Sequence, residues 1–340
     1  MSRRIAICGG TSLGHAMAAV LGADPANDVR MLTGQPERWS REVRAIYLNI
    51  AEVIGRLSHV TDNAREAIDG AEIVFICTPL HTRKSLLRTI APWLTARTWV
   101  GGVPGFGGFD REAFAIVGDR ARIFGLQRVP YVRRTVSYGE TVWISGIRPK
   151  LFVATVGNED TREIAGLLEA LLTIPTAPLS TYLAVALSSS NAIFHPARLM
   201  TAFPAPAFQA SRARGDQFYE HWDDDASVAY LALDRDVQAI AQARGVPAED
   251  AMPITRHFVV ETPAALTARI RSIRALRDRR LPLRGTDRIL DCESHYVNED
   301  AWFALPTIKR IAEESMLDTP VLDRAIAWAA AAKSVLTQRN

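Results

Sequence analysis

The stretch Arg4–Ala18, RIAICGGTSLGHAMA, decides the fold expected for this chain. Its opening residues, Arg4–Cys8, are mostly apolar and predict a buried strand. A glycine turn follows, and a helical pattern of apolar residues begins directly after it. A strand, a tight turn and a helix in this order are typical of a unit that binds a dinucleotide.

The glycines of the turn suit the binding of a pyrophosphate. Gly9 and Gly10 allow backbone N–H groups to approach phosphate oxygens, and Gly14 allows the helix to pack close to the strand. The N-terminus of the helix directs partial positive charge toward the same phosphates. Thr11 stands where the motif usually has its second glycine, so a strand–turn–helix without a ligand is the alternative interpretation. The residues expected to bind the cofactor here are Gly9, Gly10, Thr11, Ser12, Leu13 and Gly14.

The end of the second predicted strand, Asp28–Leu32, indicates which dinucleotide is bound. NAD enzymes usually carry an acidic residue there, which holds the ribose 2′-hydroxyl. Here Thr33 and Arg38 follow the strand instead, and this favours the 2′-phosphate of NADP. A surface arginine is the alternative interpretation of Arg38, and Glu37 keeps NAD open as the cofactor.

A central strand and the loops after it predict the rest of the first domain. The run Glu72–Cys77, EIVFIC, is almost wholly apolar, as expected of a central parallel strand. Thr78 and Pro79 follow its carboxyl end, where open α/β sheets bind ligands, so both are expected to contact the cofactor. Strands and helices continue to about residue 179, beyond which the patterns are almost wholly helical. We therefore expect an α/β domain with a doubly wound parallel sheet that binds NAD(P) over residues 1–179, and an all-α domain over residues 180–340.

Length and composition indicate a globular protein with two domains. The chain has 340 residues, of which 48% are hydrophobic and 23% are charged, and a chain of this length usually forms two domains. The formal net charge of +3 is too small to indicate binding to nucleic acid. The chain has no apolar run that approaches the roughly 18 residues needed to span a membrane, so no membrane contact is expected.

Cysteine usage and the N-terminal residues favour the cytoplasm. Cys8, Cys77 and Cys292 are scattered without the spacing of a metal site, so no metal is expected. Cys8 and Cys77 end apolar strands and are interpreted as core thiols, which suits a reducing compartment. The sequence passes directly from MSRR into a strand, and this leaves no room for a signal peptide.

The second half opens with a helical pattern over Thr181–Thr201. Ser188, Asn191 and His195 are spaced so that they share one face of that helix. A polar stripe on an otherwise apolar helix needs partners in the protein or in a ligand. Pro196 is expected to kink the helix directly after His195. This makes His195 a candidate catalytic residue, with a satisfied core histidine as the alternative interpretation.

Five segments spread over most of the chain carry a resemblance to a known family. They are GGTSLGHA (9–16), VPGFGGFD (103–110), GLQRVPYVRR (125–134), SSSNAIFHPARLM (188–200) and HYVNEDAWFALP (295–306). In this order they resemble the octopine/nopaline (opine) dehydrogenase family. The N-x-x-x-H-P block within the fourth segment is the most specific of them.

The resemblance implies a Rossmann-type domain followed by an all-helical domain, with the active site between them. Members of the family condense the amino group of an amino acid with a 2-oxo acid and reduce the product with NADH or NADPH. By position, His195 matches the catalytic histidine, Asp300 matches the aspartate paired with it, and Asn191 belongs to the same block. The expected partners are therefore a small-molecule amine and a 2-oxo acid, and a homodimer is left open.

Departures from the family pattern affect the expected substrate residues. His295, followed by Tyr296, stands where the family typically has an arginine thought to help hold a substrate, and Phe106 stands where the glycine loop often has a glutamine. Arg128 and Arg134 are candidates to bind substrate carboxylates, because a planar guanidinium binds a carboxylate at two points. A salt bridge or a solvent-facing position is the alternative for each. Arg134 matches the family's block, whereas Arg128 is inferred from proximity alone.

Two other functions share much of this pattern. His195, with an ordinary pKa near 6.5, suits proton transfer in both directions, and Asp300 would fix its tautomer and orientation. A reductase of a simple 2-oxo acid, of the ketopantoate reductase type, would have the same two-domain plan. A non-catalytic NADP-binding regulator would keep the glycine turn but would not need His195 and Asp300 near the nicotinamide.

Overall fold

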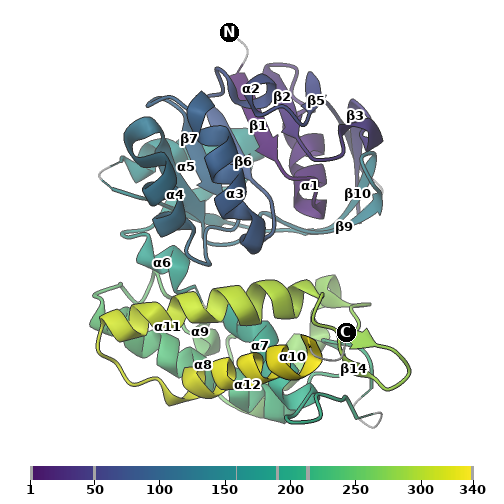
Figure 1. The fold of residues 1–340 in the computed structure, drawn as a ribbon, viewed down its shortest axis with the longest axis vertical. Coiled ribbons are helices and arrows are strands. Elements are labelled where there is room, and N and C mark those ends of the chain that lie inside the picture. Colours follow the sequence, from purple (N-terminus) through teal and green to yellow (C-terminus); the bar gives the residue numbers. More distant parts are fainter. Residues whose placement is uncertain (1–2, 49–50, 158, 189–190, 212–214, 338–340) are drawn as a thin grey trace. The chain divides into compact units, whose positions relative to one another are not determined.

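The computed structural model describes residues 3–48, 51–157, 159–188, 191–211 and 215–337. The chain divides into two compact units, Met1–Ala186 and Leu187–Asn340, here called the sheet unit and the helical unit. In Figure 1 the sheet unit is coloured from purple to teal, and the helical unit continues to yellow. The division falls a few residues after the boundary at 179 that was expected from the sequence.

The sheet unit is built on eight strands in the order β12-β11-β8-β7-β6-β1-β2-β5. Neighbouring strands are parallel except for β8 and β11, which pair antiparallel. The predicted doubly wound, mainly parallel sheet is confirmed. Its strands are β1 (Arg3–Cys8), β2 (Asn27–Leu32), β5 (His59–Thr61), β6 (Ile73–Ile76), β7 (Trp99–Gly102), β8 (Arg122–Leu126), β11 (Leu151–Thr155) and β12 (Thr176–Pro178).

Polar caps begin several helices of the sheet unit. Thr11 caps the first helix by accepting a hydrogen bond from the backbone N–H of Gly14, and its hydroxyl also donates to the carbonyl of Cys77. Asn63 and Asp160 cap two further helices in the same way. The helices are α1 (Ser12–Leu21), α2 (Ala64–Ile68), α3 (Leu80–Ile90), α4 (Phe109–Val117), α5 (Thr161–Leu172) and α6 (Leu183–Ala186).

A second sheet of four strands, in the order β4-β3-β10-β9, packs against α1. Its members are β3 (Glu42–Tyr47), β4 (Glu52–Arg56), β9 (Tyr131–Ser137) and β10 (Thr141–Ile147). Tyr138 and Gly139 lie in the hairpin turn between β9 and β10, which pair antiparallel. Strands β3 and β4 were not expected from the sequence. As a result α1 contacts both the large sheet, through β1 and β2, and this smaller sheet.

The helical unit packs its helices around α7 (Asn191–Ala202), which contacts α8 (Asp224–Ala243) and a π-helical segment, η6 (Tyr296–Ala304). Figure 1 shows the longer helices of this unit in green and yellow. A short two-stranded sheet interrupts the expected all-helical pattern. The remaining elements are α9 (Ile254–Phe258), α10 (Pro263–Ser272), β13 (Leu283–Arg284), β14 (Ile289–Leu290), α11 (Leu305–Glu314) and α12 (Pro320–Thr337).

The single helix predicted over Thr181–Thr201 is wrong. The structure has the short helix α6 and then α7, and Ser188 lies outside both. The sequence offers a reason in the serines that begin at Ser188, because serine hydroxyls compete for backbone hydrogen bonds and favour caps and turns over helix interiors. The polar stripe of Ser188, Asn191 and His195 therefore does not form. Two of the serines, at positions 189 and 190, lie outside the described residues.

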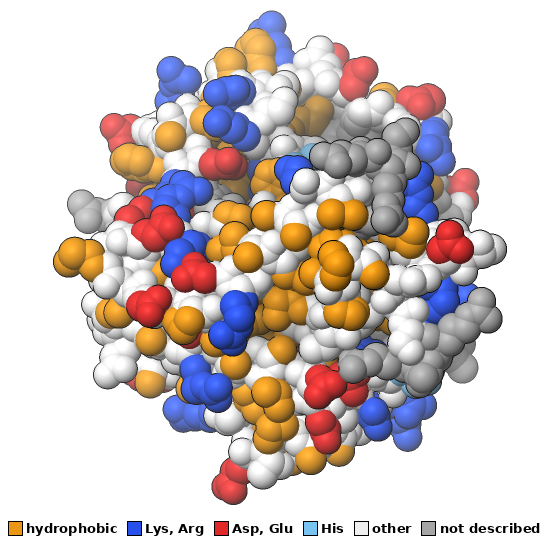
Figure 2. Space-filling view, turned by 60° about the horizontal axis from the view of Figure 1, so that its bottom comes forward, with side chains coloured by type: hydrophobic (Ala, Val, Ile, Leu, Met, Phe, Trp, Pro, Cys, Tyr) orange, Lys and Arg blue, Asp and Glu red, His pale blue; other side chains and the backbone are white. Residues whose placement is uncertain are grey.

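Charges of both signs are mixed with apolar side chains on the face drawn in Figure 2, where orange side chains gather near its centre. This distribution is in keeping with the formal net charge of +3. Over the ranges that the structure describes, no helix combines the length and the apolar character needed to cross a membrane.

Candidate active site

The glycine turn of the sheet unit has no room for side chains. Gly9 adopts a φ of +117°, which residues with a Cβ rarely adopt. A Cβ on Gly14 would lie 2.0 Å from the carbonyl oxygen of Gly9, so α1 packs directly on the end of β1. The turn thus leaves the N-terminus of α1 close to the carboxyl end of β1, and the first turn of this helix has no acidic residue. This arrangement suits an anionic ligand.

Side chains from the smaller sheet and from the end of β2 surround Gly10. A Cβ on Gly10 would lie 2.4 Å from the hydroxyl of Tyr138 and 3.1 Å from the hydroxyl of Thr33. Arg38 is exposed, stacks on the Tyr138 ring at 4.5 Å, and donates to Gln35 Oε1 at 2.8 Å. The predicted residue Thr33 therefore lies directly beside Gly10, whereas Arg38 contacts the ring of Tyr138, whose hydroxyl lies beside Gly10.

His15 joins α1 to the hairpin of the smaller sheet. Its Nδ1 lies 2.8 Å from the carbonyl oxygen of Thr11, and its Nε2 accepts a hydrogen bond of 2.6 Å from the backbone N–H of Gly139. The ring also packs on Trp39, with 4.2 Å between ring centroids. Burial lowers the pKa of His15, so the ring is neutral at pH 7. This bridge fixes the hairpin, and with it Tyr138, against the glycine turn.

The carboxyl end of β6 adds an unsatisfied polar atom to the same region. The hydroxyl oxygen of Thr78 is buried and has no hydrogen-bond partner in the part of the chain that the structure describes. The next residue, Pro79, precedes α3. A buried hydroxyl without a partner costs free energy unless a ligand satisfies it. The turn, the helix N-terminus and this hydroxyl therefore fit a dinucleotide.

The helical unit brings His195 and Asp300 together. His195 lies on α7 and Asp300 on η6, and Nδ1 of the histidine is 2.6 Å from Oδ2 of the aspartate. Each residue is only 3% exposed. A π-helical segment is rare and often occurs at functional sites. The two residues are 105 positions apart in the sequence, so only the packing of α7 on η6 makes them neighbours.

Burial acts in opposite directions on the two groups. It lowers the pKa of His195 and raises the pKa of Asp300, because each charged form loses its contact with water. The two groups are in hydrogen-bond contact, so they titrate as a unit that shares a proton. A shared proton held by a buried unit is suitable for general acid–base chemistry.

Aromatic residues complete the surroundings of His195. Nε2 lies 2.8 Å from the hydroxyl oxygen of Tyr219. The ring of Tyr296 is 4.5 Å from the His195 ring, and the ring of His295 is 6.3 Å away. Tyr296 and His295, both expected at the substrate site, therefore do lie beside His195. Two neighbours of His195 were not expected from the sequence. They are Tyr219 and Phe218, and the Phe218 ring lies 5.5 Å from the His195 ring.

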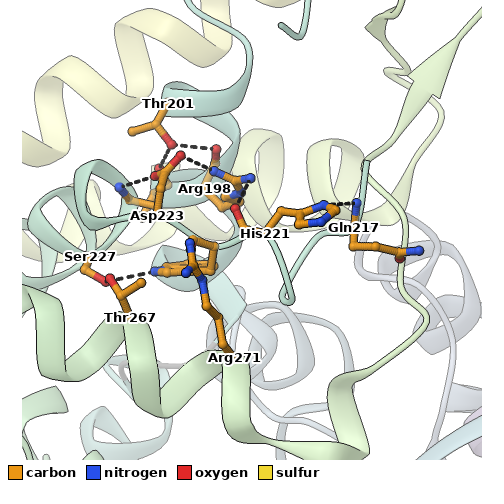
Figure 3. Close-up of polar contacts among 11 residues, drawn as sticks. Arg198, Thr201, Gln217, His221, Asp223, Ser227, Thr267 and Arg271 are labelled. Carbon is orange, nitrogen blue, oxygen red and sulfur yellow. Dashed lines mark hydrogen bonds and ion pairs between the residues drawn. The ribbon is translucent and has the colours of Figure 1, made fainter. Parts of the chain in front are cut away.

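A buried arginine fixes the segment that carries Tyr219. Figure 3 shows Arg198 of α7 reaching Asp223 and His221. The guanidinium is fully buried; Nη1 donates to Asp223 Oδ2 at 2.7 Å and Nη2 donates to the carbonyl of His221 at 2.6 Å. Asp223 is also the N-cap of α8. One arginine, three positions after His195, thus ties the Tyr219 segment to both α7 and α8.

Trp222 anchors the same segment to α8 and α10. Its indole N–H donates to Ser227, whose hydroxyl lies 2.7 Å from the hydroxyl of Thr267. Arg271 donates from Nε to the carbonyl of Trp222 at 2.6 Å. Ser227, Thr267 and Arg271 appear together in Figure 3. This network leaves the backbone on the C-terminal side of Tyr219 little freedom to move.

Three other predicted substrate residues, Asn191, Phe106 and Arg134, lie in different surroundings. Asn191 is exposed at the start of α7. Phe106 is buried in the sheet unit, where its carbonyl accepts from Arg83. Arg134 is exposed on β9 and lies over the Trp143 ring at 5.3 Å. This is the solvent-facing strand position that was the alternative interpretation of Arg134.

Arg128 has a second arginine as a neighbour. It follows β8 at the carboxyl edge of the parallel sheet, and Arg148 is held nearby by a hydrogen bond from its backbone N–H to the carbonyl of Pro130, at 2.9 Å. Burial and the positive charge of Arg128 lower the pKa of Arg148 to about 10. Nε of Arg148 is buried without a hydrogen-bond partner among the described residues. The pair is a candidate site for an anion.

The cysteines of the sheet behave as core groups. Cys8 and Cys77 are both buried, and burial raises the pKa of Cys8 and raises that of Cys77 to about 12. Both thiols are therefore neutral at pH 7, which is unfavourable for nucleophilic chemistry.

Comparison with known proteins finds a family model that matches most of the helical unit. Residues 178–333 match the model described as "NAD/NADP octopine/nopaline dehydrogenase, alpha-helical domain". This part of the chain is similar to the helical domain of octopine/nopaline dehydrogenases. The family resemblance seen in the sequence is thereby confirmed. The predicted class of enzyme, an NAD(P)-dependent oxidoreductase of the opine dehydrogenase type, is confirmed with it.

Relatives of this opine dehydrogenase-type chain match over nearly its full length. Tauropine dehydrogenase of Arabella iricolor is 24% identical, over 96% of this chain and 90% of that protein. A structure of octopine dehydrogenase in complex with NADH and agmatine has a TM-score of 0.83 at 20% identity, over 96% of this chain and 89% of that one. A yersinopine dehydrogenase with NADP⁺ bound has a TM-score of 0.70 at 13% identity, over 100% of this chain and 92% of that one. These structures share the fold, and a nicotinamide dinucleotide is the family's cofactor.

Proposed function

We propose that this chain condenses an amine with a 2-oxo acid and reduces the resulting imine with NADPH. The observation that supports this most directly is the buried contact of 2.6 Å between His195 Nδ1 and Asp300 Oδ2. These two residues match the family's histidine and aspartate by position. A histidine oriented by a carboxylate is a recurrent acid–base unit.

The sheet unit would hold the cofactor through the glycine turn. Backbone N–H groups at Gly9–Gly14, with the hydroxyl of Thr78, would bind the pyrophosphate. Arg38, steadied by Gln35 and Tyr138, would bind the 2′-phosphate, with Thr33 beside it. When bound, the reduced nicotinamide supplies a hydride to the imine carbon. NADPH is proposed over NADH because Arg38 offers a cation where NAD enzymes usually have a carboxylate.

His195 would move the protons of the reaction. The oxygen of the 2-oxo acid must leave as water before the imine can be reduced, and protonation of that oxygen makes it a better leaving group. The pair of His195 and Asp300 would supply this proton. The balanced reaction takes one amine, one 2-oxo acid, NADPH and one proton, and gives a secondary amine, NADP⁺ and water.

The substrate carboxylates need cations. Arg128 is the better candidate of the two predicted arginines, because the exposed Arg134 is stacked on Trp143. Arg148 beside it adds a second positive charge at the same edge of the sheet. On the helical unit, Tyr296 and His295 are proposed to contact the amine, since both rings lie beside His195.

The test is the oxidation of NADPH with a matrix of amines and 2-oxo acids, followed by mass spectrometry of the product. We expect amine-dependent turnover and a product with the mass of the secondary amine. His195→Ala should lower kcat by about 10²- to 10⁴-fold, whereas the exposed His59→Ala should leave it unchanged. Turnover with a 2-oxo acid alone would favour a ketopantoate reductase type of activity. Cofactor binding without turnover on any pair would favour a regulator.

The cofactor preference has its own test. Arg38→Ala should lower the preference for NADPH over NADH by roughly tenfold, as expected for loss of a charge-assisted hydrogen bond. The matched control is Arg41→Ala, which removes another exposed arginine three positions away. An unchanged preference in Arg38→Ala would contradict the assignment of this residue to the 2′-phosphate.

A further inference from the structure

The hydroxyl of Tyr219 occupies the ring nitrogen of His195 that acid–base chemistry would use. Nδ1 of His195 faces Asp300 at 2.6 Å, and Nε2 faces the Tyr219 oxygen at 2.8 Å. Both ring nitrogens therefore have protein partners inside the helical unit. Tyr219 is itself 6% exposed. A proton that leaves Nε2 in this geometry reaches the Tyr219 oxygen first.

Packing on two sides fixes the Tyr219 ring in this position. The ring of Phe194 stacks on it at 5.6 Å, and the ring of Phe218 lies at 4.8 Å. The backbone that follows is held by the bonds of Arg198 to Asp223 and His221 that Figure 3 shows. Because both the ring and the backbone are anchored, the contact of Tyr219 with His195 is part of the packed core of this unit.

The protonation state of the pair of His195 and Asp300 determines whether Tyr219 donates or accepts the hydrogen bond with Nε2. Without an added proton, the N–H of Nδ1 donates to Asp300 and Nε2 accepts from Tyr219. With one added proton, Nε2 carries a hydrogen whether the shared proton lies nearer to Nδ1 or to Asp300. Nε2–H then donates to the Tyr219 oxygen, and the hydroxyl hydrogen of Tyr219 is free to point elsewhere. Proton uptake by the pair thus reverses the direction of the hydrogen bond.

The next partner of Tyr219 is Tyr296. Each of the two phenols affects the pKa of the other. Tyr296 also precedes Asp300 on η6 and packs on His195 at 4.5 Å between ring centroids. A hydrogen-bonded series of polar groups therefore runs from Asp300 through His195 to Tyr219. Such a series can pass a proton over several ångströms without moving a side chain.

We propose that Tyr219 is a proton-relay residue that carries the proton between His195 and the reacting oxygen of the substrate. In one step Nε2 gives its hydrogen to the Tyr219 oxygen while the hydroxyl hydrogen of Tyr219 passes to the hydroxyl oxygen of the adduct of amine and 2-oxo acid. The C–O bond of the adduct then breaks, water leaves, and the nitrogen lone pair forms the C=N bond of the protonated imine. One proton moves from the pair to the substrate, Tyr219 is unchanged, and no electrons are transferred. This inference rests on the proposed function.

The test is Tyr219→Phe, which removes the hydroxyl and keeps the ring that packs on Phe194 and Phe218. We expect kcat to fall on the order of 10²-fold, with the KM of the amine and of the 2-oxo acid changed by less than about threefold. The matched control is Tyr230→Phe, because the ring of Tyr230 packs on the same Phe194, with 4.9 Å between ring centroids. A wild-type kcat in Tyr219→Phe, or a raised one, would overturn the relay.

A double-mutant cycle separates a relay from a purely structural role. If Tyr219 acts only through His195, then Tyr219→Phe should cause no further loss of kcat in a His195→Ala background. A structural role would lower activity by a similar factor in both backgrounds. Additive losses would therefore contradict the relay.

Nuclear magnetic resonance of the histidine ring nitrogens tests the contact without any turnover. We expect the Nε2 signal of His195 to shift in Tyr219→Phe and to stay in place in Tyr230→Phe. An unchanged signal in Tyr219→Phe would overturn the relay in a protein whose fold is intact by circular dichroism. If the wild-type protein turned over no amine and 2-oxo acid pair, the proposed function would fail. If the wild-type protein is active and Tyr219→Phe matches it, only the relay fails.

Discussion

At the scale of single residues, burial determines the chemistry of His195 and Asp300. The unfolded chain has ordinary pKa values of 6.5 and 3.8 for these groups, so between those values it holds one proton on the histidine and none on the aspartate. Burial lowers the first pKa and raises the second, and the folded pair also holds one proton over that range. The opposing shifts therefore largely cancel in the pH dependence of stability, while the pair keeps a proton available.

Gly14 carries a sharp prediction, because its missing side chain is what lets α1 pack on β1. In Gly14→Ala the new Cβ would lie 2.0 Å from the backbone oxygen of Gly9, which cannot turn away as a side chain would. We expect the free energy of unfolding to fall by about 1–3 kcal/mol and the Kd for NADPH to rise at least tenfold. Denaturant titration and fluorescence titration measure the two effects.

Gly34 provides the control for that substitution. A Cβ on Gly34 would have no atom of the described residues within 4 Å. Gly34→Ala should therefore change the free energy of unfolding by less than about 0.5 kcal/mol. Equal effects of the two substitutions would contradict the role given to the close approach at Gly14.

At the scale of elements, the interior of the helical unit depends on one buried guanidinium. Arg198→Ala would remove the link between α7 and the N-cap of α8 and leave Asp223 without that partner. Asp223 is a quarter exposed, so water would satisfy part of the loss. We expect the free energy of unfolding to fall by about 3 kcal/mol and kcat to fall with it, because the Tyr219 segment loses an anchor.

The exposed Arg256 on α9 is the matched control for Arg198. Arg256→Ala should change neither the free energy of unfolding nor kcat beyond experimental error, as is usual for surface substitutions. Denaturant unfolding measures the free energy of unfolding of both variants, and steady-state kinetics measures their kcat. A small effect of Arg198→Ala on stability would show that water or a neighbouring group replaces the arginine.

His15 links α1 to the hairpin of β9 and β10, and this link should depend on pH. Burial holds the pKa of His15 below that of the unfolded chain, so below pH 6.5 the unfolded state binds a proton that the folded state does not. Stability should therefore be full above pH 6.5 and fall as the pH decreases below it. We expect Tm to drop between pH 7.5 and pH 5, and to drop less in His15→Gln. Equal drops in the two proteins would assign the effect to other groups.

At the scale of the whole molecule, the two units would divide the work. The residues proposed to bind NADPH all belong to the sheet unit, whereas His195, Asp300 and Tyr219 belong to the helical unit. Fusing a dinucleotide-binding fold to a separate domain allows the second to vary for new substrates while the first stays constant. The departure at His295, which belongs to the helical unit, fits such variation.

This division predicts that catalysis and cofactor binding can be lost separately. His195→Ala should bind NADPH with a Kd within about threefold of wild type, even though its turnover is lost. In Gly14→Ala the main defect should instead be weaker binding of NADPH. Fluorescence titration of NADPH measures both. A tenfold weaker Kd in His195→Ala would mean that the histidine also contributes to cofactor binding.

Much of the fold could be predicted because its signals are local. The strand, turn and helix at Arg4–Ala18, the apolar run of β6 and the caps of α2 and α5 each depend on residues within a few positions. The prediction over Thr181–Thr201 failed because a run of serines outweighed the apolar periodicity around it. Strand β3 was missed although its charged and apolar residues alternate; its parallel partner β10 follows about a hundred residues later in the chain, so the pairing leaves no local signal.

The sequence by itself determined the dinucleotide-binding turn, the mainly parallel sheet, the helical second half and the family, because each rests on short patterns with a fixed chemical meaning. Only the tertiary structure decided that Tyr219 faces Nε2 of His195, that Tyr138 lies over the glycine turn and that Arg148 lies near Arg128. These contacts join segments that are distant along the chain and are set by packing and burial. The spacing of residues along the chain does not predict these contacts, because a buried hydrogen bond depends on which helices and strands meet in space.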